Sequence, residues 1–211
     1  MVTVTKKDLV ALGYGNSFAT DIIRLARQPR DGERFLRVYY KLGAGISRAA
    51  AEEAVRLAER WGGDEGMARR AAILHDCTKY LELDDQLRLC RQYGVELDEL
   101  EQQAVKLLHA KTGAGIARDI FGEPDEVYEA IFWHTTGRAN MTLLDKILYM
   151  ADYIEPNRDF DGVEELSRLA YTDLDQAMML GVESTIQEME QRGVPIHKNT
   201  LAARDWLKKH G

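Results

Sequence analysis

Hydrophobic residues recur with helical spacing along nearly the whole chain. In residues 98–108 and 173–189, apolar side chains lie three and four positions apart, as they do on one face of an amphipathic helix. No long stretch alternates between apolar and polar residues in the way a half-buried strand does. The pattern predicts an all-α fold of about nine or ten helices.

Residues with end-of-helix chemistry stand at the borders of these periodic stretches. Gly94 and Gly122 follow helical runs, where a glycine in a left-handed conformation commonly ends a helix. Thr142, Asp173 and Thr200 each precede an apolar-periodic stretch, and their side chains are of the kind that caps a helix N-terminus. We therefore predict helix ends at the two glycines and helix starts at the other three residues.

The first residues of the chain differ in composition from the remainder. Residues 5–27 predict two short helices separated by a Gly/Asn-rich turn, and the polar stretch 28–33 contains a proline and a glycine, as linkers do. A length of 211 residues suits one domain with an appendage. We predict an N-terminal helical segment over residues 1–33 and a main domain over residues 34–211.

Composition and charge exclude several classes of protein. With 45% hydrophobic and 30% charged residues the chain is not disordered. The 28 basic and 35 acidic residues give a net charge of −7, so duplex nucleic acid is disfavoured as the principal ligand. Cys77 and Cys90 are too few for a disulfide framework and are expected as reduced thiols. Because the sequence shows neither a signal peptide nor about 18 consecutive apolar residues, we expect a cytoplasmic protein without a membrane span.

One apolar run ends in residues that can bind a metal. His75 and Asp76 close the run AAILHD, and Lys79 follows one helical turn later. Adjacent helical positions point about 100° apart, so the imidazole and the carboxylate can both reach an ion at the helix edge, with the lysine on the same side. Nitrogen and oxygen donors of this kind suit zinc, iron or manganese. Taken alone, the pair is better explained as an ordinary polar pair at a helix end.

Three further residues of the same chemistry follow in later predicted helices. His109 stands in LLHA, His134 ends the apolar run IFWH, and Asp152 interrupts the apolar stretch YMADYI. Each has an ordinary explanation, either a core histidine bonded to a backbone carbonyl or an aspartate paired with an arginine. A buried carboxylate needs a metal or another cation. Because one such residue occurs in each successive helix, we interpret the set as a metal site.

The order His-Asp, His, His, Asp on successive helices resembles the HD-domain metallophosphohydrolases. The strings LLHA, HTTGRANMTLLDKI and ADYIEPNR resemble more specifically the YqeK-like family, the bacterial symmetrical diadenosine tetraphosphate hydrolases, and the resemblance covers residues 49–206. It implies an HD-domain helical bundle that hydrolyses dinucleoside tetraphosphates to two nucleoside diphosphates with a divalent metal. It also allows a homodimer.

The resemblance implies a site with one or two metal ions. His75, Asp76 and Asp152 would hold one ion, expected to be iron, with manganese or zinc as alternatives. Asp76, His109 and His134 would face a second position, so that Asp76 bridges the two.

The resemblance also implies how the substrate is bound. Lys79 and Arg138 would contact phosphate oxygens, and with Asp76 they form the predicted catalytic set. The predicted substrate-binding residues beyond these two are Thr135, Thr136, Gly137, Tyr153, Glu155 and Arg158. The first three would form the turn that directs His134.

The chain departs from the family pattern near its start. Tyr40 stands where the family has another metal-binding histidine, and no histidine precedes His75. Either tyrosinate replaces that ligand, although phenol has a pKa of about 10, or activity is lowered. Residues 4–27 resemble a small DNA-binding module of the excisionase kind, but they suit a helical pair packed on the main domain as well. His197 is expected as a solvated loop residue.

Two alternative functions follow from these departures. The same site could serve another HD-type nucleotide phosphohydrolase or phosphodiesterase. The chain could also be a catalytically weakened nucleotide-binding or DNA-associated protein.

Overall fold

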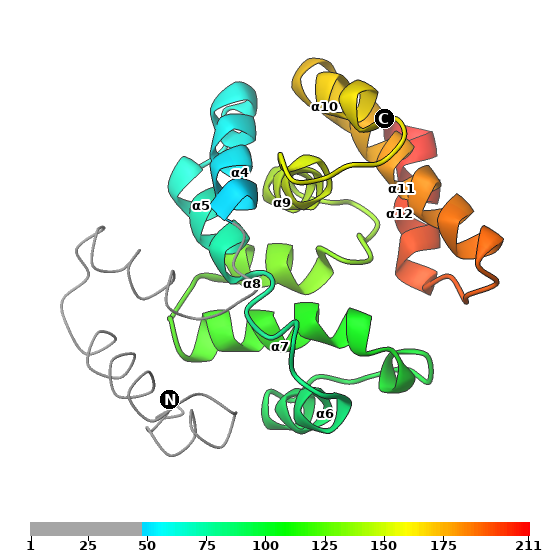
Figure 1. Ribbon diagram of the computed structural model, residues 1–211. Coiled ribbons are helices and arrows are strands. Elements are labelled where there is room, and N and C mark those ends of the chain that lie inside the picture. Colours follow the sequence, from blue (N-terminus) through cyan, green and yellow to red (C-terminus); the bar gives the residue numbers. More distant parts are fainter. Residues whose placement is uncertain (1–47) are drawn as a thin grey trace.

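The structure is a computed structural model that describes residues 48–211, and every regular element in that range is a helix (Figure 1). The all-α prediction is confirmed. The nine α-helices of the described range are α4 (Arg48–Trp61), α5 (Glu65–Leu74), α6 (Leu83–Gln92), α7 (Val105–Asp119), α8 (Asp125–Trp133), α9 (Leu143–Ile154), α10 (Val163–Thr172), α11 (Leu174–Gln191) and α12 (Lys198–His210), and a 3-10 helix, η1 (Glu101–Gln103), precedes α7.

Helix α9 lies at the centre of the bundle. It packs against α4, α5, α8, α10 and α11 (Figure 1). Its residues Leu148, Met150 and Ala151 are fully buried, as expected for a helix that has neighbours on several sides. Asp152, near the C-terminal end of α9, is only partly buried, with 24% of its side chain exposed.

Small residues bring the neighbouring helices close to the end of α5. Ala54 and Ala58 on α4 and Ala71 and Ala72 on α5 are fully buried in one core cluster. On α7, a Cβ atom added at Gly113 would lie only 3.1 Å from the carbonyl oxygen of His75. The missing side chain thus lets α7 pass directly against the end of α5.

The capping pattern confirms most of the predicted helix ends. Thr142 accepts a hydrogen bond from the backbone N–H of Asp145 in a capping box, and Asp173 accepts one from Gln176. Gly94, with a φ of +66°, follows the C-cap of α6. These are the positions at which a side-chain acceptor or a left-handed residue was required.

Two local predictions about helices are wrong. Helix α12 begins at Lys198 rather than after Thr200, because the Nδ1 atom of His197 accepts a hydrogen bond from the backbone N–H of Asn199 at 3.2 Å. Residues 98–108 form a turn, η1 and the start of α7 instead of one helix. Asp98 and Glu101 exchange side-chain-to-backbone hydrogen bonds of 2.9 and 3.0 Å, which fixes a local turn there.

Both cysteines are free and buried, and burial raises the pKa of the Cys77 thiol to about 12. Among residues 48–211, no helix is long and apolar enough to cross a membrane. Tyr40, the segment 1–33 and the boundary at residue 34 lie outside the described residues.

Candidate metal centre and substrate cavity

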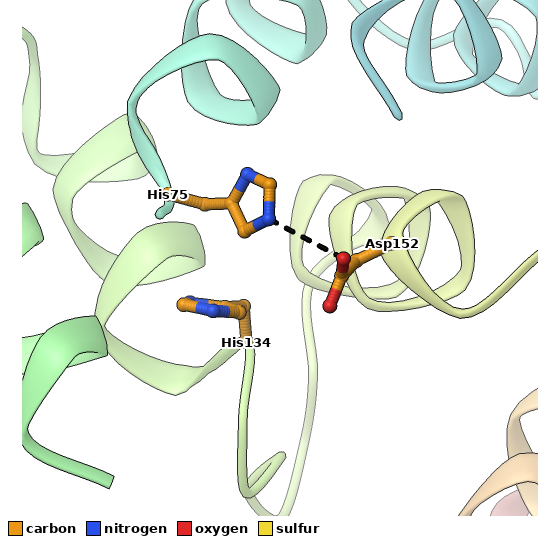
Figure 2. Close-up of side chains that lie close together, drawn as sticks. All are labelled: His75, His134 and Asp152. Carbon is orange, nitrogen blue, oxygen red and sulfur yellow. Dashed lines mark ion pairs between the residues drawn. The ribbon is translucent and has the colours of Figure 1, made fainter. Parts of the chain in front are cut away.

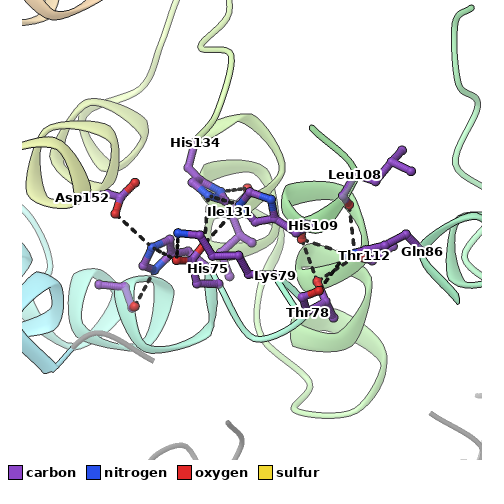
Figure 3. Close-up of polar contacts among 12 residues, drawn as sticks. His75, Thr78, Lys79, Gln86, Leu108, His109, Thr112, Ile131, His134 and Asp152 are labelled. Carbon is purple, nitrogen blue, oxygen red and sulfur yellow. Dashed lines mark hydrogen bonds and ion pairs between the residues drawn. The ribbon is translucent and has the colours of Figure 1, made fainter. Parts of the chain in front are cut away.

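The structure brings together the five histidine and aspartate residues that the sequence singled out. They come from four places in the chain (Figure 3). The chain leaves α5 through His75 and Asp76, α7 carries His109, His134 directly follows α8, and Asp152 lies near the end of α9.

Two of the histidines are oriented by the helices that they end. The Nδ1 atom of His75 lies 2.7 Å from the carbonyl oxygen of Ala72, and that of His134 lies 2.7 Å from the carbonyl oxygen of Ile131. A carbonyl only accepts, so in both rings Nδ1 carries the proton and donates. Each Nε2 atom of the neutral ring is thereby left with a lone pair, which is the tautomer that metal-binding histidines use.

The Nε2 atoms and carboxylate oxygens converge on one small volume. Nε2 of His75 lies 3.4 Å from Oδ1 of Asp152 (Figure 2). The same Nε2 atom lies 3.5 Å from Oδ2 of Asp76. Nε2 of His109 lies 3.1 Å from Oδ1 of Asp76 and 3.2 Å from Nε2 of His134. Two triads have all their ligand atoms within 4.8 Å of one another, namely His75, His134 and Asp152, and Asp76, His109 and His134. His134 is the residue that these two triads share.

The polar atoms of this cluster fit a divalent cation. Nε2 of His75 and Oδ1 of Asp76 are buried, and among the described residues neither has a hydrogen-bond partner of acceptable geometry. Buried acceptors without a donor are costly, whereas a bound cation satisfies several of them at once. Nitrogen and carboxylate oxygen in this combination are the donors that iron, zinc and manganese accept.

Electrostatics keep His134 and the two carboxylates in the states that a cation requires. Burial, assisted by the charges of His75 and His109, lowers the pKa of His134 to about 3, so its ring is neutral at physiological pH. Burial acts to raise the pKa of Asp76 and of Asp152, but the neighbouring histidines outweigh it and hold both pKa values below their usual range. Burial acts to lower the pKa of His75, and the proximity of Asp152 and Asp76 raises it overall. The site therefore presents two ionised carboxylates.

A network of hydrogen bonds fixes the loop after α5 against α7. The hydroxyl of Thr78 donates to the carbonyl oxygen of His109 at 3.0 Å and lies 2.7 Å from the hydroxyl of Thr112 (Figure 3). The side-chain amide of Gln86 donates to the carbonyl oxygen of Thr78 at 2.6 Å. Because both threonines and Gln86 are buried, Asp76 is held in place beside His109.

A cavity of about 1010 Å³ opens beside the cluster. His109, His134 and Asp152 contribute to its wall. Three cationic residues also line it, namely Lys79, Lys106 and Arg158. Lys79 is paired with Oδ2 of Asp76, and Nη2 of Arg158 donates to Oδ1 of Asp152 at 2.7 Å. The acidic lining residues Asp152, Asp161 and Glu188 equal these cations in number, so a polyanionic ligand would be bound by individual cationic side chains and not by a net positive charge.

Most of the other residues that line the cavity are aromatic or uncharged. Tyr149 and Tyr153 stack with ring centroids 5.9 Å apart, and the hydroxyls of both approach that of Thr185. Sequence reasoning missed Lys106 and the face of α11. For α11, the available signal was the recurrence of polar residues at helical spacing. The α11 residues that line the cavity are Ser184, Thr185, Gln187, Glu188 and Gln191.

Some of the predicted substrate-binding residues lie apart from the cavity. Thr135, Tyr153 and Arg158 line it. Thr136 and Gly137 belong to the turn after His134, and Gly137 has a φ of +66°. Glu155 is buried and accepts hydrogen bonds from the backbone and the side-chain amide of Asn157.

Arg138 also lies apart from the lining of this cavity. Its Nε atom donates to Oδ2 of Asp145 at 2.9 Å, and its Nη1 atom donates to Oε2 of Glu129. The guanidinium is therefore already engaged by two carboxylates.

A third cluster of metal-ligating residue types is neutralised by protein cations. Asp98, Glu101 and His197 have ligand atoms within 4.8 Å of one another. Nζ of Lys111 lies 2.9 Å from Glu101, and Nζ of Lys198 lies 3.0 Å from Asp98. Since Nδ1 of His197 accepts from Asn199, its Nε2 carries the proton and points at Glu101, 3.1 Å away.

The expectation for His197 is therefore wrong. The residue is buried rather than solvated, with 1% of its surface exposed. It caps α12 and packs against acidic residues that lie nearly a hundred positions earlier in the chain.

Comparison with known proteins agrees with this fold and cluster. The model of the HD domain matches residues 47–157, a range that contains all five residues of the cluster. Residues 2–29 match a second model, a domain of unknown function (DUF3173). The fold and the site together define an HD-domain protein, and membership of that class implies a divalent metal, which the two triads are able to bind.

The curated relatives narrow this class. The chain is 38% identical to the symmetrical bis(5'-nucleosyl)-tetraphosphatase of Bacillus subtilis, covering 73% of this chain and 83% of that protein. It is 41% identical to the protein of the same name from Halalkalibacterium halodurans, covering 74% and 83%. A crystal structure of a "predicted HD superfamily hydrolase involved in NAD metabolism" from Clostridium acetobutylicum superposes with a TM-score of 0.80 at 35% identity, covering 87% of this chain and all of that one. The chain therefore belongs to the HD-domain family, in the YqeK-like group of symmetrical bis(5'-nucleosyl)-tetraphosphatases.

Proposed function

We propose that the protein is a metal-dependent hydrolase that cuts dinucleoside tetraphosphates symmetrically into two nucleoside diphosphates. The observation that carries the proposal is the overlap of the two His/Asp triads on the wall of a cavity that three cationic side chains also line. The names of relatives that cover about three quarters of this chain support the substrate.

We propose that His75, Asp76, His109, His134 and Asp152 hold one or two divalent ions, with iron as the expected metal and manganese or zinc as alternatives. A bound ion of this kind lowers the pKa of a coordinated water and polarises a phosphoryl oxygen. The protein contributes the orientation of His75 and His134 through their Nδ1 hydrogen bonds, and the two ionised carboxylates.

We assign the contacts with phosphate to the cations of the cavity. In a symmetrical cut, a water oxygen bonds to one of the two inner phosphorus atoms, and the central bridging oxygen leaves with the other nucleoside diphosphate. We propose that Lys79, Lys106 and Arg158, which line the cavity, offset the negative charge of the phosphate chain. Thr135 and Tyr153, which also line the cavity, are proposed to contact the nucleotide.

Other predictions from the sequence stay predictions. They concern the division of the chain near residue 34, a homodimer, a cytoplasmic location and the absence of a nucleic acid partner.

Product analysis tests the proposal directly. The full-length protein, loaded in turn with iron, manganese and zinc, is incubated with diadenosine tetraphosphate, and the nucleotides are separated by chromatography. We expect ADP as the single product, and a matched Asp76→Asn variant should give none. Formation of AMP with ATP, or hydrolysis of other nucleotides only, would contradict the symmetrical cut. The second outcome would favour another HD-type phosphohydrolase.

A further inference from the structure

Arg138 joins the two elements that carry His134 and Asp152. Its Nε and Nη2 atoms lie 2.9 and 2.8 Å from Oδ2 of Asp145 in the first turn of α9. Its Nη1 atom donates to Oε2 of Glu129 on α8. One planar guanidinium thus binds carboxylates on two different helices, which is the geometry that distinguishes arginine from lysine.

The contact with α9 is rigidly tied to the position of Asp152. Asp145 is 1% exposed, and its Oδ2 atom also accepts from the backbone N–H of Thr142 at 3.0 Å. Asp145 and Asp152 are seven residues apart, which is about two helical turns, so they lie on the same face of α9. A shift of Asp145 relative to α8 is therefore transmitted to Asp152 along the helix.

The contact of Arg138 with Glu129 lies near the end of α8 that precedes His134. Oε2 of Glu129, the atom that accepts from Arg138, also accepts from the indole Nε1 of Trp133 at 2.8 Å. Trp133 is the last residue of α8, and His134 follows it directly. Arg138 therefore fixes the end of α8 from which His134 extends.

We propose that Arg138 is a positioning residue that sets the spacing between His134 and Asp152 and so determines the affinity of the metal centre. It acts through Asp145 and Glu129 and does not contact substrate phosphate, in contrast to the role that the family resemblance implied. The inference builds on the metal centre of the proposed function, but its main readout is metal affinity. It can therefore fail or hold whichever nucleotide the protein cleaves.

The test measures metal affinity and substrate kinetics separately. Arg138→Met, Arg138→Lys and Glu129→Gln are made in the full-length protein, Mn²⁺ affinity is measured by competition with a chelator, and kcat and KM are measured at saturating Mn²⁺. We expect Arg138→Met to weaken Mn²⁺ binding by about 10-fold, the lower end of what lost support of metal ligands costs. Arg138→Lys should rescue this loss only in part, because one ammonium cannot serve both carboxylates. The KM at saturating metal should stay within about 2-fold.

A matched control shows whether the loss is specific. Arg118→Met removes another partly exposed arginine that pairs with a carboxylate, that of Asp119, and stacks on Tyr128. It should leave Mn²⁺ affinity unchanged. A raised KM with unchanged Mn²⁺ affinity in the Arg138 variants would indicate that Arg138 contacts substrate phosphate, and it would overturn the proposal. Unchanged KM together with unchanged Mn²⁺ affinity would also overturn it.

Stability is separated from positioning by a double variant. Arg138→Met leaves the buried carboxylate of Asp145 without this cation, and the protein should be destabilised. Adding Asp145→Asn removes that charge and should recover much of the thermal stability without recovering Mn²⁺ affinity. If affinity recovers together with stability, Arg138 has no positioning role. Glu129→Gln keeps Asp145 paired, so it tests the link to α8 even if Arg138→Met does not fold.

Discussion

Nη2 of Arg158 donates to Oδ1 of Asp152 at 2.7 Å, and this same oxygen lies 3.4 Å from Nε2 of His75. The sequence offered two explanations for an aspartate inside an apolar helix, a metal ligand or a partner of an arginine. The geometry satisfies both, because one oxygen faces the histidine cluster and also a cation on the wall of the cavity. Arg158 and a metal ion bound at this cluster would therefore share the charge of Asp152.

Arg158 should affect substrate binding and not metal retention. Replacing it with Gln removes a cation from the cavity wall but leaves the ligand atoms of Asp152 in place. We expect KM for a dinucleoside tetraphosphate to rise by about 10-fold, in the range for one lost hydrogen bond to a charged group. Mn²⁺ affinity should be unchanged or higher, since a competing cation is gone. Steady-state kinetics at saturating Mn²⁺, with chelator competition on the same samples, provide both values. Weaker Mn²⁺ binding would mean that Arg158 orients Asp152 instead.

Asp152 itself should be needed for the metal. Asp152→Asn keeps the shape of the side chain and removes its charge, so we expect Mn²⁺ affinity to fall by at least about 100-fold, the upper end of the cost of lost metal-site support. Metal binding to the native state also stabilises it, by about 2.7 kcal/mol at a metal concentration 100 times the Kd. Thermal unfolding of wild type should therefore occur at lower temperature after chelation, whereas the variant should show almost no such difference. An equal chelator effect in both proteins would remove Asp152 from the ligand set.

His134 should make the metal-free protein sensitive to acid. Its pKa is about 3 in the folded state and about 6.5 in an unfolded chain, so between these pH values the unfolded state binds a proton that the native state does not. Stability must then fall as pH is lowered through this window, by up to about 1.4 kcal/mol per pH unit. The raised pKa of His75 acts differently: its contribution is fully present below pH 6.5 and is lost only as pH rises through its folded pKa.

Urea unfolding of chelated protein at pH 6.5 and 4.5 measures this effect. Wild type should lose more stability between the two pH values than His134→Gln, because only wild type has the histidine that binds a proton on unfolding. The carboxylates that titrate in acid are present in both proteins, so their contribution cancels in the comparison. Equal losses would indicate that His134 is already protonated in the native state.

The metal cluster could be predicted from the sequence because its residues interrupt apolar runs. His109 and His134 are buried and Asp152 is partly buried, and each is a polar residue at a position where the helical spacing of its neighbours predicts an apolar one. The role of Arg138 could not be predicted in this way. Its partners, Glu129 and Asp145, lie nine positions before and seven after it, and the turn between α8 and α9 decides that they meet.

His197 was misjudged for a related physical reason. Its sequence neighbours predict a loop, and the acidic partners that bury it, Asp98 and Glu101, come from a turn about a hundred residues away. Helical periodicity reports which face of an element is apolar, but it carries no information on which distant element covers a polar residue. For the same reason the polar face of α11, with Thr185 in the cavity wall, was not assigned to the site.

Gly115 should be the glycine of α7 that least tolerates a side chain. A Cβ atom there would lie 2.1 Å from Cδ2 of Tyr93, whose ring is buried between α6 and α7. Because the nearest atoms belong to a packed ring, Gly115→Ala must displace the ring or the helix, and we expect a loss of about 1–3 kcal/mol in the free energy of unfolding. Gly181→Ala in α11 is the matched control, since its Cβ atom would meet Tyr149 and Met150 at ordinary distances of 3.7 and 3.8 Å. That variant should be as stable as wild type or more stable, by up to about 1 kcal/mol, because alanine favours a helix over glycine. Urea unfolding should thus show a loss of stability for Gly115→Ala and no loss for Gly181→Ala. Equal stability of Gly115→Ala and wild type would show that α6 and α7 are not in the close contact described.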